Sequence, residues 1–339
     1  MPGHVPVAPS HAMLHHTGQI LYNILLPLLL MVGFGTLLQR YQTLSLETLA
    51  RVSMYLLVPS FLLIKIYDSD IPWGEIGLIA LVFLIVLGAL GVLLFTSSRA
   101  IGAPNKTVAA VILGSIVFNA GNFGIPVAHL LYVEGGTLFQ GQPDAEAGLH
   151  VQALVVMLSN LLVWFLGYLV LAVARGGRAR EALGILKLPI PYALVTSFIL
   201  REIRLRSFNG ADFLPVWVSF PLRSLSGALV PMMLVALGAQ LAKGARWPRW
   251  RQVAPIAFVK LLALPALVGA AAYAFGLWPW PGAHLIIGAA APTAVNTLIL
   301  TIELDGDAEL TGDVVFWTTI FSGVTVAGVI AVVTALGAA

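Results

Sequence analysis

The sequence contains no cysteine and little charge. The absence of cysteine excludes disulfide bonds, thiolate catalysis and cysteine-ligated metal sites. Charged residues make up only 10% of the 339 residues, whereas soluble domains carry roughly 25%. Hydrophobic residues make up 59%, and the mean hydropathy is +0.95. No single globular core needs this much apolar surface, so we expect lipid to be the solvent for most of the chain.

Ten apolar runs fill the chain, each close to the roughly 20 residues that a membrane-spanning helix needs. They cover residues 19–38, 47–67, 74–98, 106–132, 149–173, 185–205, 216–241, 251–275, 283–304 and 312–336. The predicted fold class is therefore an all-α integral membrane protein with ten transmembrane helices and no separate soluble domain. Residues 1–18 contain no Lys, no Arg and no apolar run, so we expect a flexible external N-terminus and no cleavable signal peptide.

Basic residues in the connections indicate the orientation, because Lys and Arg concentrate in cytoplasmic loops. They cluster after the first, third, fifth and seventh spans, which predicts a multi-pass protein of the cell inner membrane with both termini external. Two connections depart from the rule. Arg201, Arg204 and Arg206 follow the sixth span on the external side, and the cytoplasmic turn DGDAEL at 305–310 is acidic.

The two halves of the chain share sequence features in register. RVSMYLLVPSFLLI begins at Arg51 and RSLSGALVPMMLVA begins at Arg223, and both contain Leu-Val-Pro at the same offset. We expect both arginines to act as interfacial anchors whose charged ends reach the membrane surface. GSIVFNAGN in the fourth span matches GAAAPTAVN in the ninth in its first Gly and last Asn.

Because each half has an odd number of spans, the halves must lie in the membrane with opposite orientation, as an inverted repeat. The predicted organisation is an N-terminus at 1–18, a first five-helix repeat at 19–173, a cytoplasmic basic loop at 174–184 and a second five-helix repeat at 185–339.

The fourth span contains a built-in break. Asn119, Gly121, Asn122, Gly124 and Pro126 fall within eight residues, where the glycines loosen the backbone and the proline removes a donor. A helix in lipid must satisfy its backbone groups internally. Such a break is therefore tolerable only where it lines a cavity.

Proline suits the first position of a helix, so Pro126 and Pro292 are each predicted to begin a second half-helix near mid-membrane. These half-helices run in opposite directions, and both N-termini, each with roughly half a positive charge, point at the bilayer centre. This arrangement predicts an anion site. Its further donors are the amides of Asn119, Asn122 and Asn296 and the hydroxyl of Thr293.

Four more residues are candidates for supporting or coupling roles. Lys260 lies mid-span and either acts in function or pairs with a helix C-terminus, and the sequence leaves both open. His129 follows Pro126 by one turn and either relays protons or faces the external vestibule. Glu303 lies roughly 16 Å along the helix from Pro292 and is a candidate gate. The hydroxyl of Ser115, with the nearby asparagines, offers oxygen ligands for sodium.

Several stretches together resemble the auxin efflux carrier family, the PIN-like carriers whose bacterial members include malonate and malate permease-like proteins. They are YLLVPSFLL at 55–63, NAGNFGIP at 119–126, LVPMMLVALGAQLA at 229–242, APTAVNTLIL at 291–300 and DGDAEL at 305–310. The resemblance covers essentially the whole chain. This chain lacks the long loop that plant members carry between spans five and six, so auxin is not expected as its substrate.

The resemblance implies ten helices in two inverted five-helix repeats with crossed, broken helices four and nine, a fold shared with bile-acid symporters and sodium/proton antiporters. It also implies a scaffold of helices 1, 2, 6 and 7, a transport domain of helices 3–5 and 8–10, elevator-type alternating access and a homodimer. The family role of holding a substrate carboxylate maps onto Asn119, Pro126, Pro292 and Asn296.

The expected function is secondary transport of small organic anions, mono- or dicarboxylates, with H⁺ or Na⁺ as possible coupling ions. A sodium-coupled symporter of the bile-acid type and a non-transporting membrane sensor are the alternatives. A cation/proton antiporter would place carboxylates beside the breaks, and residues 107–132 and 284–302 contain none. No enzyme activity is expected, because the span interiors contain no Asp and the chain has no G-x-S-x-G motif. No cofactor, metal or nucleic acid is expected to bind.

Overall fold

The computed structural model describes residues 26–70, 72–124, 127, 148, 151–152, 154–159, 166–167, 169–171, 189–242 and 248–337. Within these residues all secondary structure is helical, apart from one isolated β-bridge. Four helical segments are long and apolar enough to cross a membrane: Trp73–Ala100, Val216–Ala236, Trp250–Ala274 and Ala308–Leu336.

This all-helical architecture fits the predicted integral membrane protein. The count of ten spans and the inverted repeat stay predictions. The predicted N-terminus at 1–18, the basic loop at 174–184 and much of the fifth span lie outside the described residues.

Two spans contain a change of helix type, in which an α-helix continues as a short π-helical segment, labelled η, and a third π-helical segment, η3, follows a non-helical stretch. The described elements are α2 (Leu26–Tyr41), α3 (Leu46–Val52), η2 (Ser53–Leu57), α4 (Val58–Tyr67), α5 (Trp73–Ala100), α6 (Asn105–Ile116), η3 (Ala120–Gly124), α9 (Ile190–Ser207), α10 (Val216–Ala242), α11 (Trp250–Phe258), η6 (Val259–Ala263), α12 (Leu264–Ala274), α13 (Gly282–Ala289), α14 (Val295–Glu303) and α15 (Ala308–Gly337).

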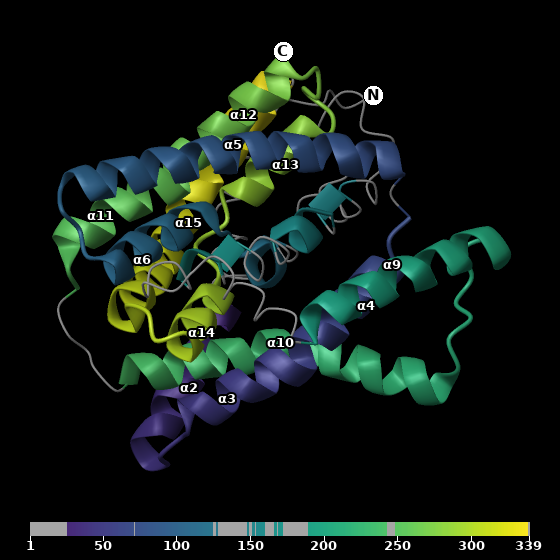
Figure 1. The fold of residues 1–339 in the computed structure, drawn as a ribbon, viewed down its shortest axis with the longest axis horizontal. Helices are drawn as coiled ribbons and strands as arrows, with labels where there is room; N and C mark the ends of the chain where they lie inside the picture. Colours follow the sequence, from purple (N-terminus) through teal and green to yellow (C-terminus); the bar gives the residue numbers. More distant parts are fainter. Residues whose placement is uncertain are drawn as a thin grey trace, which may run out of the picture.

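The helices form two groups that lie side by side (Figure 1). In one group, α10 packs along α2 and α4, and α4 packs on α9. In the other, α5 packs on α6, α12 packs on α13, and α15 contacts α6, α11, α13 and α14. The main link between the groups is α14, which contacts α3 and α10. The first group holds spans one, two, six and seven; its role as a scaffold stays a prediction.

The tightest helix crossing joins α2 to α10 at two glycines. A Cβ atom on Gly35 would overlap the backbone of Val235, and one on Gly238 would overlap the backbone of Val32. The Thr36 hydroxyl lies 3.0 Å from the carbonyl oxygen of Gly238 and adds a hydrogen bond across the crossing. Small residues allow membrane helices to approach this closely, and the gain is dispersion contact along both backbones. The two glycines therefore set the spacing of this helix group.

The buried arginines of α9 explain one exception to the loop-charge rule. Arg201 and Arg204 are 1% and 6% exposed. The Nε of Arg201 donates to the carbonyl of Ser69 at 2.8 Å, and that of Arg204 donates to the carbonyl of Tyr67 at 2.8 Å. Arg204 also pairs with Asp70. These charges serve to fix the end of α4 against α9, so they do not act as free loop charges.

Arg223, which is predicted to be a membrane-surface anchor, forms ion pairs within this helix group. Its guanidinium pairs with Asp68 at 2.6 Å and with Asp212 at 3.1 Å, so it joins α10 to the end of α4 and to the loop after α9. Burial raises the pKa of Asp212, but hydrogen bonds from the Tyr67 hydroxyl and the Leu214 N–H, together with Arg223, hold that pKa below its usual value. Like the α9 arginines, Arg223 has a binding partner within this helix group.

The glycine crossing gives a matched pair of test variants on α2. We expect Gly35→Ala to lower the free energy of unfolding by about 1–3 kcal/mol, because its methyl group forces the two backbones apart. Gly33→Ala is the control, since a Cβ at Gly33 meets nothing within 4 Å. Thermal unfolding of both variants in detergent measures the difference. Equal melting temperatures would contradict the close backbone approach.

Candidate functional site

Both stretches predicted to be broken are interrupted. In the first, α6 ends at Ile116, and the backbone is non-helical until η3 begins at Ala120. In the second, α13 ends at Ala289 and α14 begins at Val295. The residues between them are non-helical apart from a short turn.

The two interruptions cross and pair through their backbones. Phe118 and Thr293 form an antiparallel β-bridge. The N–H of Asn119 donates to the carbonyl of Pro292 at 2.7 Å, and the N–H of Ala294 donates to that of Val117 at 3.4 Å. Each broken segment thus satisfies polar groups that the other exposes. Non-helical backbone inside a membrane needs such pairing, because lipid offers no hydrogen-bond partners.

The position of Pro292 differs from the prediction. Pro292 does not begin a half-helix: α14 starts at Val295 after Ala294, whose extended backbone precedes the helix. Proline disfavours the helical conformation in the residue before it, so α13 must end upstream. The Pro292 carbonyl then accepts the bond from Asn119. In the first stretch the helix already ends before Val117, and Pro126 lies outside the described residues.

Asn119 and Asn296 flank the crossing and are each 8% exposed. Asn119 immediately precedes η3, and Asn296 lies in the first turn of α14. Thr293 is fully buried; its hydroxyl donates to the carbonyl of Gly114 at 2.6 Å and its N–H donates to the hydroxyl of Thr318 at 3.1 Å. The hydroxyl proton of Thr293 is thus used inside the protein, where it joins the two broken stretches.

The other candidates are described only in part. Gly121 and Asn122 belong to η3, and Glu303 is the last residue of α14. The side chains of Asn122 and Glu303 are not among those that the structure describes. His129 lies outside the described residues. Ser115 is buried in α6, and its hydroxyl has no hydrogen-bond partner among the residues that the structure describes.

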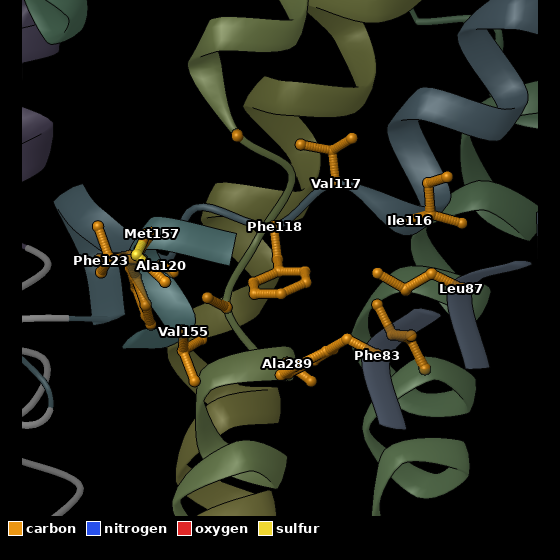
Figure 2. Packing of buried hydrophobic residues seen from close by; sticks show 14 of the residues in the cluster. Phe83, Leu87, Ile116, Val117, Phe118, Ala120, Phe123, Val155, Met157 and Ala289 are labelled. Atoms are coloured by element: carbon orange, nitrogen blue, oxygen red, sulfur yellow. The ribbon is translucent and has the colours of Figure 1, made fainter. Parts of the chain in front are cut away.

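Lys260 contacts both broken stretches. It lies in η6 and is fully buried. Its Nζ donates to the carbonyl of Ala289 at 2.8 Å and lies 5.3 Å from the centroid of the Phe118 ring. Ala289 is the last residue of α13, so the amine caps the negative end of a helix. Figure 2 shows Phe118 in one buried cluster with Ala289 and with Phe83 of α5, and the stacked rings of Phe83 and Phe118 have centroids 5.4 Å apart.

Two comparisons with known proteins show similarity to membrane transport proteins. A family model described as membrane transport protein matches residues 181–330, which include the second broken stretch. A protein from Methanothermobacter thermautotrophicus, described as an uncharacterized transporter, is 23% identical over 302 residues, which cover 88% of this chain and 93% of the relative. The match over residues 181–330 supports the predicted resemblance to a family of membrane transport proteins.

Three residues that the sequence analysis did not single out support the crossing of this carrier. Gln152 is 1% exposed, and its Nε2 donates to the carbonyl of Ala120 at 2.9 Å. Ser159 donates to the carbonyl of Phe118 at 2.5 Å, and Thr318 accepts from Thr293. All three are polar residues within predicted apolar spans. A polar residue inside an apolar run is the sequence signal that could have identified them.

The acidic turn after α14 is neutralised by neighbouring helices. Asp305 pairs with Lys106 at 2.9 Å and Asp307 pairs with Arg249 at 2.7 Å. Asp307 also accepts the N–H of Leu310 at 3.1 Å and so caps α15. Burial alone would lower the pKa of Arg249. The hydrogen bond to Asp307 and the surrounding carboxylates have the larger combined effect, so the pKa is raised above its usual value. The turn thus fixes the starts of α6, α11 and α15 to one another.

The role of Thr293 can be tested by an isosteric change. Thr293→Val removes the hydroxyl and leaves the buried carbonyl of Gly114 without that donor, which we expect to lower the free energy of unfolding by about 1–3 kcal/mol. The control is Thr325→Val, because the Thr325 hydroxyl bonds only to the carbonyl of Phe321 in its own helix among the described residues. Thermal unfolding in detergent compares them. A Thr293→Val variant as stable as the control would contradict a joining role for this hydroxyl.

Proposed function

We propose that this chain is a secondary transporter of small organic anions and that it holds the substrate carboxylate at the crossing of the two broken stretches. The observation that carries the proposal is the buried backbone pairing of Phe118 with Thr293. This pairing brings the start of α14 next to the segment from which η3 begins. The match of residues 181–330 to a membrane transport family supports transport over a purely sensory role.

The charge at the crossing favours an anion. The helix α14 begins without a side-chain cap, so its first N–H groups and roughly half a positive charge are directed at the crossing. Asn296 in its first turn and Asn119 opposite add amide donors. No Asp or Glu lies in residues 107–132 or 284–302 to compete with a carboxylate. A cation site of the antiporter type therefore has no acidic ligand in these stretches.

The arrangement of the helices is compatible with elevator-type alternating access. Among the described elements, the group containing α5, α6 and α11–α15 meets the group containing α2–α4, α9 and α10 mainly through α14. A sparse boundary allows one group to slide against the other. We propose that the first of these groups carries the substrate, and that the second is the scaffold through which two chains form a homodimer in the inner membrane with external termini. We retain two inverted five-helix repeats as the proposed topology.

The position of Lys260 favours dicarboxylates as substrates. A helix N-terminus compensates one carboxylate, and a second carboxylate needs another positive partner. Lys260 is the cation that contacts Ala289 of one stretch and Phe118 of the other. We therefore propose small dicarboxylates of the malonate or malate class as the preferred cargo.

The site assignment is tested by removing the two amides. We expect Asn119→Ala and Asn296→Ala each to weaken malonate binding at least about tenfold, since a hydrogen bond to a charged group contributes about 1.5–3 kcal/mol. Uptake of labelled malonate into proteoliposomes should fall in parallel. Asn105→Ala, an exposed change at the far end of α6, is the control. Undiminished affinity in both well-folded variants would show that the carboxylate binds elsewhere, and failure of the wild-type protein to transport any carboxylate would overturn the function.

The cargo class is tested by removing the amine. We expect Lys260→Met to bind labelled acetate still, because the end of α14 is untouched, but malonate should no longer displace the acetate effectively. Competition assays on wild type and variant measure this selectivity. Malonate binding that survives the change would assign the second carboxylate to another partner.

A further inference from the structure

The Lys260 amine is incompletely compensated for a buried ammonium group. An ammonium has three N–H donors, and the described residues supply one acceptor, the carbonyl of Ala289, with the Phe118 ring beside it. None of the ion pairs among the described residues includes Lys260. The partial negative charge at the end of α13 offsets part of a full positive charge. The remaining cost of burying an unpaired charge is several kcal/mol.

The charged and titratable groups on neighbouring elements lie toward the ends of their helices. Lys260 is ten residues, roughly 15 Å, from the start of α11. Asp313 precedes Thr318 by five residues, roughly 7–8 Å along α15, and interacts with Arg249. His284 precedes Ala289 by a similar distance on α13, with its ring edge-on to Trp280. The full set on α6, α11, α12, α13 and α15 is Lys106, Arg251, Tyr273, His284, Glu309 and Asp313.

We propose that Lys260 is the proton-binding group of this carrier, so that one proton binds together with each substrate anion. This inference rests on the proposed function, because it needs a carboxylate at the crossing. The step is a simple protonation. The amine lone pair takes one H⁺ from the aqueous side to which the site is open, and the ammonium faces the incoming carboxylate. The proton and the anion leave together on the opposite side.

The linkage follows from the charge balance of the site. An anion at the crossing supplies the negative charge that the ammonium lacks in the empty site, and in a low-dielectric interior this attraction is strong. Anion and proton therefore stabilise each other's binding to the same extent. The bound proton cancels one of the two negative charges that a dicarboxylate brings to the moving group. This reduces the cost of carrying the anion through the membrane interior.

The same geometry disfavours sodium as the coupling ion at this point. Sodium sites in broken-helix carriers use the carbonyls at half-helix C-termini. Here the carbonyl of Ala289, at the end of α13, already accepts a hydrogen bond from Lys260. The Lys260 amine thus occupies the position beside this carbonyl that a sodium ion would need.

Calorimetric titration with malonate in buffers of different ionisation enthalpy counts the protons taken up on binding. From about pH 7 to about pH 10, above the carboxylate range, we expect wild-type uptake to rise toward one proton per malonate. Its affinity should fall by up to about tenfold per pH unit. Lys260→Arg keeps the charge but does not release its proton, so malonate should bind this variant without proton uptake and with little dependence on pH. Replacing sodium by choline should leave wild-type binding unchanged.

Acetate binding to Lys260→Met provides a second measurement if the arginine variant does not fold. We expect acetate to bind this variant without proton uptake, and to bind wild type with it. Malonate binding to wild type without proton uptake, uptake that persists in either variant, or a requirement for sodium would overturn the inference and leave the proposed function standing. Failure of wild type to bind any carboxylate would instead overturn the proposed function, and the inference with it.

Discussion

The backbone pairing between two broken helices is the constraint on which the rest of the site depends. Breaking a helix inside a membrane exposes N–H and C=O groups that lipid cannot satisfy, each at a cost of several kcal/mol. The bonds from Asn119 to Pro292 and from Ala294 to Val117 let two breaks satisfy each other. Neither break is stable without its partner at the same depth, so the crossing fixes the relative position of two segments far apart in the sequence.

Buried side chains donate further hydrogen bonds to backbone carbonyls at and near the crossing. Gln152, Ser159 and Thr293 each donate to a backbone carbonyl of the first broken stretch or of the helix turn that precedes it. Lys260 does the same for the last carbonyl of α13. These residues hold the two stretches rigidly. The helix end that faces the proposed substrate is α14, whose start carries no side-chain cap. Rigid support behind an uncapped helix end is what preorganised anion binding requires.

Much of this arrangement could be predicted from residue types alone. Asparagine, glycine and proline clustered in an apolar run indicate a break, and two such runs in matching halves indicate that the breaks meet. The register could not be predicted, because the start of α14 at Val295 depends on the pairing of Thr293 and Ala294 with Phe118 and Val117 of the other stretch. The partners of Arg201, Arg204 and Lys260 were also beyond the sequence. Their burial depends on which carbonyls the folded helices place within reach, and charge patterns along one chain do not encode this.

The position of α14 joins the chemistry of the site to motion. It is the half-helix whose start faces the crossing, and it is also the element that contacts α3 and α10 of the other helix group. An anion at the start of α14 therefore lies close to the boundary between the groups. The ion pairs of Asp305 and Asp307 fix the turn after α14 to the starts of α6 and α11, so α14 is held to its own group at that end. Any sliding between the groups consequently moves the whole crossing as a unit past α3 and α10. In the proposed elevator mechanism, such movement would change which side of the membrane reaches the site while its internal hydrogen bonds stay intact.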